Sequence, residues 1–141
     1  DERELDPLTA RSLAALPLEA VASDLAAAGV PDALAARFWE VARENVRTRA
    51  DIARWWRIAA EGAAPEIDPD DAAFVAEALS LLPDPPYDDE TWAAWTDAVK
   101  AQTGRKGKAL FLPLRKAVTG QARGPEMARF MPLMQVRPRA E

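Results

Sequence analysis

The apolar residues of this chain recur at the three- and four-residue spacing of helices. Trp92, Trp95 and Val99 form one such series, and Val21 and Leu25 form another. Alanine, the strongest helix former, is abundant, β-branched residues are sparse, and no window alternates apolar and polar residues for long. The pattern therefore predicts an all-α fold.

Capping residues, prolines and glycines mark the ends of the predicted helices. Asp6-Pro7 and Asp68-Pro69 each place an N-cap before a first-turn proline, and Thr48 with Asp51 forms a Thr-x-x-Asp capping pattern. We assign no helix to the apolar stretch 109–114, which precedes the turn Thr119-Gly120. The predicted helices cover roughly residues 7–16, 18–28, 32–41, 49–62, 69–82, 90–104 and 125–134.

The best candidate linker is the stretch 62–68, with the sequence GAAPEID. It predicts two small helical subdomains, residues 1–64 and 65–141, hinged near residue 65. A length of 141 residues suits one domain of ordinary size or two small domains that share a core, and about half of the residues are apolar. Because the chain begins with Asp1 rather than Met, we expect it to be part of a longer protein.

The composition excludes several kinds of chemistry. The chain has no cysteine and no histidine, so disulfides, thiolate metal sites and a Ser-His-Asp triad are impossible. Paired carboxylates such as Asp70 and Asp71 have no histidine or cysteine to share proton transfer with, so a small self-contained enzyme is disfavoured. The acidic run 88–90 is explained by helix capping. No apolar run could span a membrane. We expect no catalytic residue and no metal site.

The charges are divided along the chain. Residues 99–141 carry ten Lys and Arg against two acidic residues, a net charge of +8, whereas residues 1–98 sum to −13. No basic residue stands between Ile58 and Val99, and residues 37–57 are locally basic. Two basic zones around an acidic one suit a polyanion docking on one face, although ordinary solvated helix faces would give the same pattern.

The segment from Thr103 to Met134 concentrates glycines, prolines and basic residues. Glycine lets the backbone approach a ligand closely, and a Gly-Pro pair that leads into a helix presents free N–H groups. The basic residues could neutralise phosphates, and an arginine can also read a base edge. A loop-rich helical hairpin with solvated lysines is the alternative interpretation. The basic residues concerned are Lys106, Lys108, Arg115 and Lys116.

Within this segment, KGKALFLPLRKAVTGQARGPEM resembles a signature near the C-terminus of bacterial glutamyl-tRNA synthetases, K-G-K-x-L-F-x-P-L-R-x-A-L-T-G-x-x-x-G-P-E-L. Val118 and Met127 replace the usual leucines. Upstream, LDPLTARSLAALPLEAV and FWEVARENVRTRADIARWW are also similar to that family, so the resemblance covers nearly the whole chain. The matching positions are Lys106, Gly107, Lys108, Leu110, Phe111, Pro113, Leu114, Arg115, Ala117, Thr119, Gly120, Gly124, Pro125 and Glu126.

The resemblance implies the C-terminal anticodon-binding region of a class I aminoacyl-tRNA synthetase, a cage of helices that binds tRNA(Glu). The catalytic domain, which uses ATP and Mg²⁺, lies outside this chain, so the 141 residues alone are not expected to be catalytic and need no cofactor. Arg115 would contact an anticodon base, Gly124-Pro125 would offer backbone groups, and Met127 would pack on an unstacked base. The expected phosphate contacts are Lys106, Lys108 and Lys116.

One position departs from the family. Many members have an arginine after the glutamate of the first helix-helix turn, where it reads the third anticodon base. This chain has Asn45 there, after Glu44, and Arg47 stands close enough to replace it. The departure implies that the parent protein could also accept tRNA(Gln).

The resemblance further implies a monomeric, cytoplasmic parent without DNA or membrane partners. The alternative is a stand-alone acidic helical module that binds a partner protein. The five tryptophans could be base-stacking platforms, but helical spacing beside leucine, isoleucine and valine favours the core. They are Trp39, Trp55, Trp56, Trp92 and Trp95.

Overall fold

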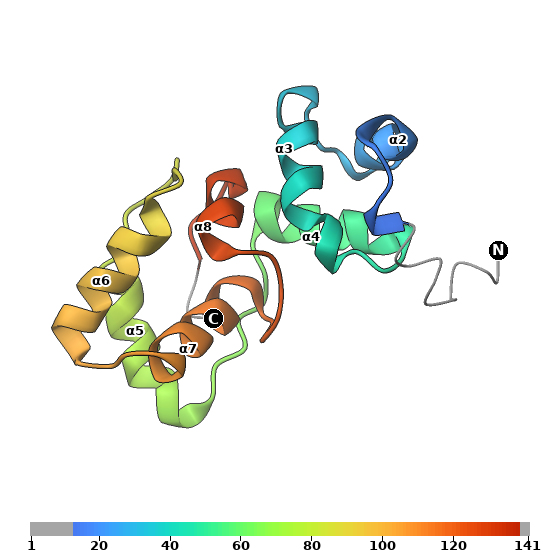
Figure 1. Ribbon diagram of the computed structural model, residues 1–141. Coiled ribbons are helices and arrows are strands. Elements are labelled where there is room, and N and C mark those ends of the chain that lie inside the picture. Colours follow the sequence, from blue (N-terminus) through green and yellow to red (C-terminus); the bar gives the residue numbers. More distant parts are fainter. Residues whose placement is uncertain (1–12, 139–141) are drawn as a thin grey trace. The chain divides into compact units, whose positions relative to one another are not determined.

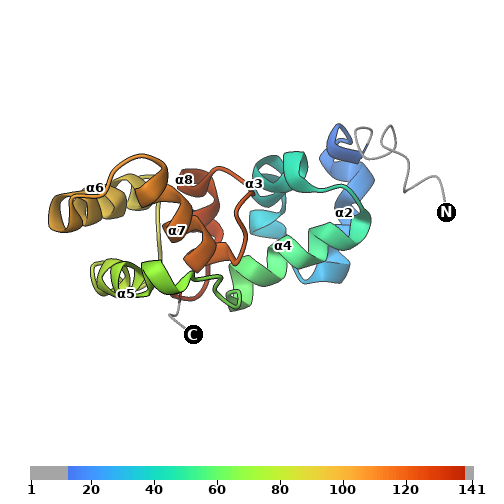
Figure 2. The same ribbon diagram turned by 90° about the horizontal axis from the view of Figure 1, so that it is seen from below.

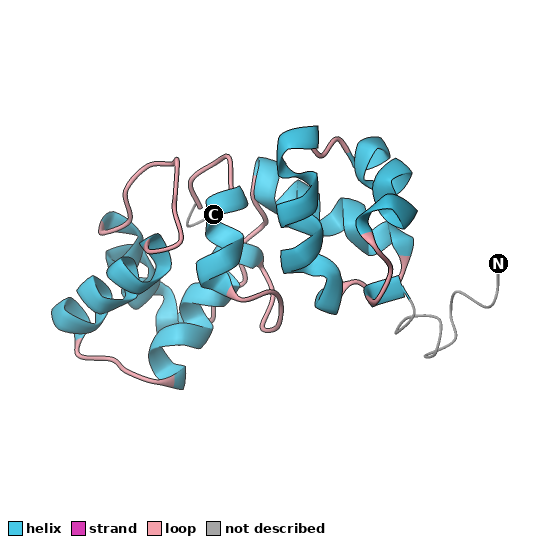
Figure 3. Ribbon diagram, turned by 45° about the horizontal axis from the view of Figure 1, so that its top comes forward, coloured by secondary structure: helices cyan, strands magenta, loops and turns pink. Residues whose placement is uncertain are grey.

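The computed structural model describes residues 13–138, and all regular elements in that range are helices (Figure 3). The all-α prediction is therefore confirmed. The first predicted helix, which begins at Asp6-Pro7, lies outside the described residues apart from its last turn. The chain forms two compact units, Asp1–Arg57 and Ile58–Glu141, and each is described by itself.

The first unit is built from α2 (Leu18–Ala28), α3 (Asp32–Ala42), the short 3-10 helix η2 (Arg43–Asn45) and most of α4 (Arg49–Glu61). Helix α2 ends at Gly29, which has a φ of 92° and donates its N–H to the carbonyls of Ala26 and Leu25. The sequence predicted this ending. The core contains Val21, Leu25, Trp39, Trp55 and Trp56, as the helical spacing predicts, together with Phe38 and Ile52.

The start of α4 shows why the turn before it has a fixed shape. The Asp51 Oδ2 atom accepts hydrogen bonds from the backbone N–H groups of Arg47 (2.9 Å) and Thr48 (3.1 Å). The Asp51 half of the predicted Thr-x-x-Asp cap is thus formed, and it serves the backbone N–H groups of the two residues before the helix. The predicted domain boundary lay between residues 64 and 65, whereas the boundary between the two units falls within α4.

The second unit contains η3 (Pro69–Asp71), α5 (Ala72–Ser80), α6 (Thr91–Thr103), α7 (Lys108–Thr119), α8 (Met127–Phe130) and η4 (Met131–Leu133). Helices α5, α6 and α7 pack against one another, and α8 lies against α6 (Figures 1 and 2). The Trp95 indole N–H donates to the Ala78 carbonyl at 2.7 Å and joins α6 to α5. The fully buried side chains include Leu110, Leu114, Met127, Phe130, Met131 and Leu133.

Helix α7 differs from the prediction, because it includes the stretch 109–114 to which no helix was assigned. Pro113 lies inside α7 and has no N–H to donate to the carbonyl four residues earlier. That carbonyl, of Ala109, instead accepts a hydrogen bond from the Arg105 Nη1 atom at 3.1 Å. Arg105 also pairs with the Asp71 carboxylate at 2.8 Å, and its guanidinium lies 4.0 Å from the centre of the Phe74 ring. A side chain from outside the helix therefore offsets the missing donor.

Candidate nucleic-acid interface

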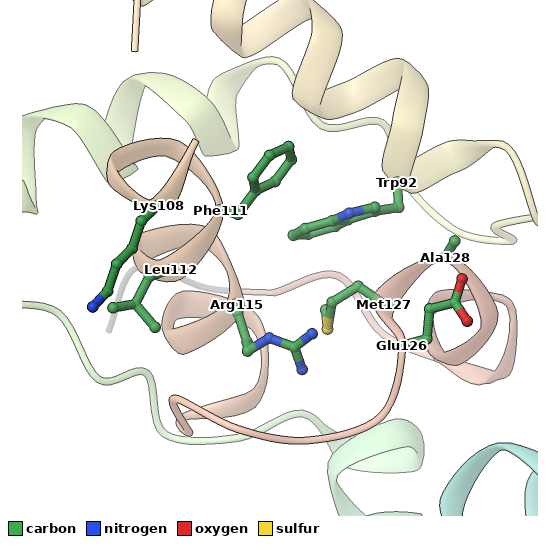
Figure 4. A pocket seen from close by; sticks show the side chains of 8 residues that line it. All are labelled: Trp92, Lys108, Phe111, Leu112, Arg115, Glu126, Met127 and Ala128. Atoms are coloured by element: carbon green, nitrogen blue, oxygen red, sulfur yellow. The ribbon is translucent and has the colours of Figure 1, made fainter. Parts of the chain in front are cut away.

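A groove of about 380 Å³ opens between α6, α7 and α8 in the second unit (Figure 4). Its walls combine aromatic rings, aliphatic side chains and charged groups of both signs. Arg115 and Met127, two of the residues that the resemblance assigns to the anticodon, both line it. The lining residues are Trp92, Lys108, Phe111, Leu112, Arg115, Glu126, Met127 and Ala128.

Arg115 is half-buried at the base of this groove. Its Nη1 atom donates to the Pro125 carbonyl at 2.9 Å, which ties the middle of α7 to the loop before α8. Burial lowers the pKa of the Arg115 guanidinium, because leaving water disfavours its charge. An arginine still remains charged near neutral pH, and only one of its five N–H donors is used among the described residues. The group is oriented and keeps donors for an incoming acceptor.

Trp92 and Phe111 form an aromatic pair on the wall of the groove. Their ring centres are 6.3 Å apart and the planes are inclined by 34°, while Trp92 also contacts Trp95 edge to face at 5.7 Å. Phe111 is 45% exposed, which is unusual for a phenylalanine in a folded chain. The ring surface that is not covered by these contacts faces the groove, and an unstacked base could stack on it.

Neither ring of this pair is among the residues that the resemblance assigns to the anticodon. Four tryptophans are buried as predicted, but the prediction that Trp92 belongs to the core is wrong, because it is only partly buried and lines the groove. Phe111 was overlooked because no helix was assigned to its segment. Once 108–119 is helical, Leu110 and Leu114 occupy the core positions, and Phe111 points away from them.

The loop residues expected to offer backbone groups lie beside Arg115. Gly124 is partly exposed, whereas Pro125 is buried and its carbonyl is already engaged by Arg115. Met127 is only 2% exposed, and its side chain points into the same space as those of Trp92, Phe111 and Arg115 (Figure 4). In this structure Pro125 therefore orients the arginine rather than offering a free acceptor.

The lysines expected to contact phosphates differ in how free they are. Lys106 is exposed and Lys108 lines the groove, and neither has a partner among the described residues. Lys116 instead pairs with the Asp68 carboxylate at 3.3 Å, and only 16% of its side chain is exposed. Lys106 and Lys108 are accordingly better placed to neutralise phosphates than Lys116.

Asn45 and Arg47 lie in the first unit, at and just after the short helix η2. The Asn45 carbonyl accepts the Trp55 indole N–H at 3.3 Å, while its side-chain amide has no partner within residues 13–138. The Arg47 guanidinium is likewise unpartnered within that range and is exposed. Arg43, by contrast, donates to the carbonyls of Ala14 (2.6 Å) and Leu16 (2.7 Å), so it supports the turn.

Two further features of residues 13–138 concern clusters of metal-ligating side chains and helices able to span a membrane. Within residues 13–138, no three acidic side chains come together as metal ligands would, and no helix is long and apolar enough to cross a bilayer. The groove of the second unit combines stacking, hydrogen-bonding and charged groups, and the turn of the first unit adds an amide and a guanidinium. These are the groups with which proteins bind single-stranded RNA loops.

Comparison with known proteins shows which protein family this chain belongs to. A family model described as an anticodon binding domain matches residues 15–135, and the chain belongs to that family. It is 62% identical over 136 residues to glutamate–tRNA ligase 1 of Roseobacter denitrificans and equally to that of Ruegeria pomeroyi. It is 59% identical over 138 residues to glutamate–tRNA ligase 2 of Dinoroseobacter shibae.

These alignments cover 96% to 98% of the chain but only 31% of each relative. The chain therefore spans about a third of the length of the curated relatives that it matches. No solved structure matches it significantly. The residues aligned with these ligases include nearly all of both units.

Proposed function

We propose that this chain is the anticodon-binding region of a cytoplasmic, monomeric glutamate–tRNA ligase and that it holds the anticodon arm of tRNA(Glu). The identity of 62% over 136 residues to ligases of that name carries the proposal. The remaining length of such a ligase, about two thirds of each relative, would bind ATP with Mg²⁺ and attach glutamate.

The groove between α6, α7 and α8 would take one unstacked anticodon base. Trp92 and Phe111 offer the stacking surface, and Arg115 offers N–H donors to base acceptors. Glu126, whose carboxylate lines the same groove, would accept from an exocyclic amino group. Lys106 and Lys108 would neutralise the neighbouring phosphates. The arrangement combines stacking, one oriented cation and one acceptor, which is how proteins read splayed-out bases.

Direct binding to tRNA tests this proposal against a protein-interaction module. Purified tRNA(Glu) should bind in a filter or anisotropy assay, and affinity should fall steeply as salt is added, since bound cations displace counterions from phosphates. A control tRNA with an unrelated anticodon should bind more weakly. If the chain binds neither RNA, or binds both equally and without salt dependence, the proposal is wrong.

Arg115 and Lys106 should differ in what they contribute. Arg115→Ala should cost about 1–3 kcal/mol of tRNA(Glu) binding and reduce selectivity, because a base contact is lost. Lys106→Ala should weaken all tRNAs alike and make the salt dependence shallower, because only a phosphate contact is lost. Titrations of both variants at several salt concentrations check this. Unchanged binding in both variants would exclude the basic segment as the docking surface.

Phe111→Ala should weaken tRNA binding by about 1–3 kcal/mol, the usual value of one base stacked on an aromatic ring. Stability should change little, since the ring is already 45% exposed. Leu81→Ala is the matched control, because Leu81 is also a large exposed side chain of the second unit (37%) but lies outside this groove. Equal losses from the two variants would argue against stacking in the groove.

A further inference from the structure

A second groove of about 330 Å³ lies in the second unit, between α6 and the segment that follows α5. Leu81, which is 37% exposed, and Pro83 form one side, and Ala94 and Ala98 of α6 form the other. The two alanines are one helical turn apart and both exposed, so a neighbouring segment could approach the α6 backbone closely. None of the residues assigned to the anticodon lines this groove.

Hydrogen bonds within the chain hold the walls of this second groove in place. The Tyr87 hydroxyl donates to the Pro83 carbonyl at 2.8 Å, which closes the loop between α5 and α6. The Thr91 hydroxyl accepts from the Asp88 N–H at 2.9 Å at the start of α6. These hydrogen bonds hold the loop in one arrangement, so a ligand that binds there loses less free energy to ordering the loop.

The surroundings of the second groove are strongly acidic. Asp88 and Glu90 line it, and residues 58–99 contain eleven acidic residues and no lysine or arginine. Arg137 reaches this end of α5, where its guanidinium donates to the carbonyls of Leu79 and Leu82 and lies 3.8 Å from the Asp84 carboxylate. A polyanion such as RNA would be repelled here, and an acidic peptide would be as well.

We propose that this acidic groove binds a basic amphipathic helix of a partner protein. The aliphatic residues on one face of such a helix would pack on Leu81, Ala94 and Ala98. Lysines or arginines on its flanks would face Asp88 and Glu90. An amphipathic helix that lays its apolar face into a groove is a common mode of peptide recognition, and opposite charges at the rim favour encounter. The chain would then bind RNA and protein through different surfaces of the same unit.

A designed peptide with this chemistry tests the groove directly. The probe is a labelled helix of about 18 residues, long enough to be helical in water, with leucines at three- and four-residue spacing and lysines elsewhere. Binding is measured by fluorescence anisotropy with the 141-residue chain and with the full-length parent. Leu81→Ser and Ala98→Lys should each weaken binding by about tenfold or more, the effect of losing one central contact.

Ala93→Lys is the matched control, because it adds the same charge to the same helix at an exposed position that lines neither groove. It should change affinity by less than about twofold, as rim charges usually do. A peptide of the same composition in scrambled order should bind at least about tenfold more weakly. Thermal unfolding verifies that each variant is folded. If Leu81→Ser does not fold, Ala98→Lys still tests the groove.

Three results would overturn the proposal. The first is an equal effect of Ala98→Lys and Ala93→Lys, which would indicate diffuse attraction by negative charge. The second is equal binding of the scrambled peptide. The third is binding by the chain but not by the full-length parent, which would mean that the rest of the parent covers the groove.

Discussion

Replacing Gly120 by alanine should lower the free energy of unfolding of the second unit by about 3 kcal/mol. Gly120 ends α7 with a φ of 73°, in the left-handed region that costs a non-glycine residue roughly 1–2 kcal/mol. A Cβ atom there would stand 2.5 Å from the Ala64 carbonyl oxygen, a backbone atom that cannot turn away. The rest of the loss would come from the shift needed to relieve this contact. Urea unfolding followed by tryptophan fluorescence measures it.

Gly104 provides the control for this prediction. It ends α6 with a φ of 79°, but a Cβ built there meets no atom within 4 Å. Gly104→Ala should therefore show the conformational cost alone, about 1 kcal/mol. Equal losses at the two glycines would show that the approach of residue 64 to the end of α7 has no energetic consequence.

The second large effect is expected in the choice of tRNA. We propose that Asn45 lets the parent protein charge tRNA(Gln) as well as tRNA(Glu), two tRNAs that differ in the third anticodon base, G against C. A guanidinium favours the acceptors of C and is repelled by the N–H donors of G, whereas an amide has one donor group and one acceptor and can turn to suit either base. The Asn45 amide has no hydrogen-bond partner within residues 13–138, so no hydrogen bond there fixes its orientation.

Charging assays with the full-length protein test the role of Asn45. The wild type should prefer tRNA(Glu) by less than about a hundredfold, or 2.7 kcal/mol, and Asn45→Arg should raise that preference by about tenfold or more. Arg47→Ala is the companion variant, because Arg47 is the neighbouring exposed cation. A strong wild-type preference for tRNA(Glu) that Arg47→Ala removes would assign the reading to Arg47 and refute the role of Asn45.

Most helices could be predicted because local residues set their ends. Asp51 caps α4, and Gly29 and Gly104 end α2 and α6, so these boundaries depend on neighbouring residues rather than on tertiary contacts. Helix α7 was missed for the opposite reason. A proline inside a helix usually kinks or breaks it, and the sequence does not reveal that Arg105 offsets the hydrogen bond lost at the Ala109 carbonyl.

The sequence predicted part of the candidate site as well, but not the contacts that decide which of its residues are free. The motif pointed to Arg115 and Met127, and both line one groove. The motif could not show that Lys116 is paired with Asp68, since that contact joins residues 48 positions apart. Nor could periodicity distinguish Trp92 from the buried tryptophans, because a residue at the edge of a helical stripe has the same spacing as one at its centre.

The effect of a substitution at Arg105 depends on whether position 113 is proline, so the two positions are coupled in evolution. While position 113 is proline, losing Arg105 removes the donor of the Ala109 carbonyl as well as the contacts with Asp71 and Phe74, so substitution at 105 costs more before position 113 changes than after. If position 113 became alanine, its own N–H would serve that carbonyl, and position 105 would be freer to drift. The order of the two substitutions therefore matters, and related sequences that lack the proline should be those in which the arginine varies.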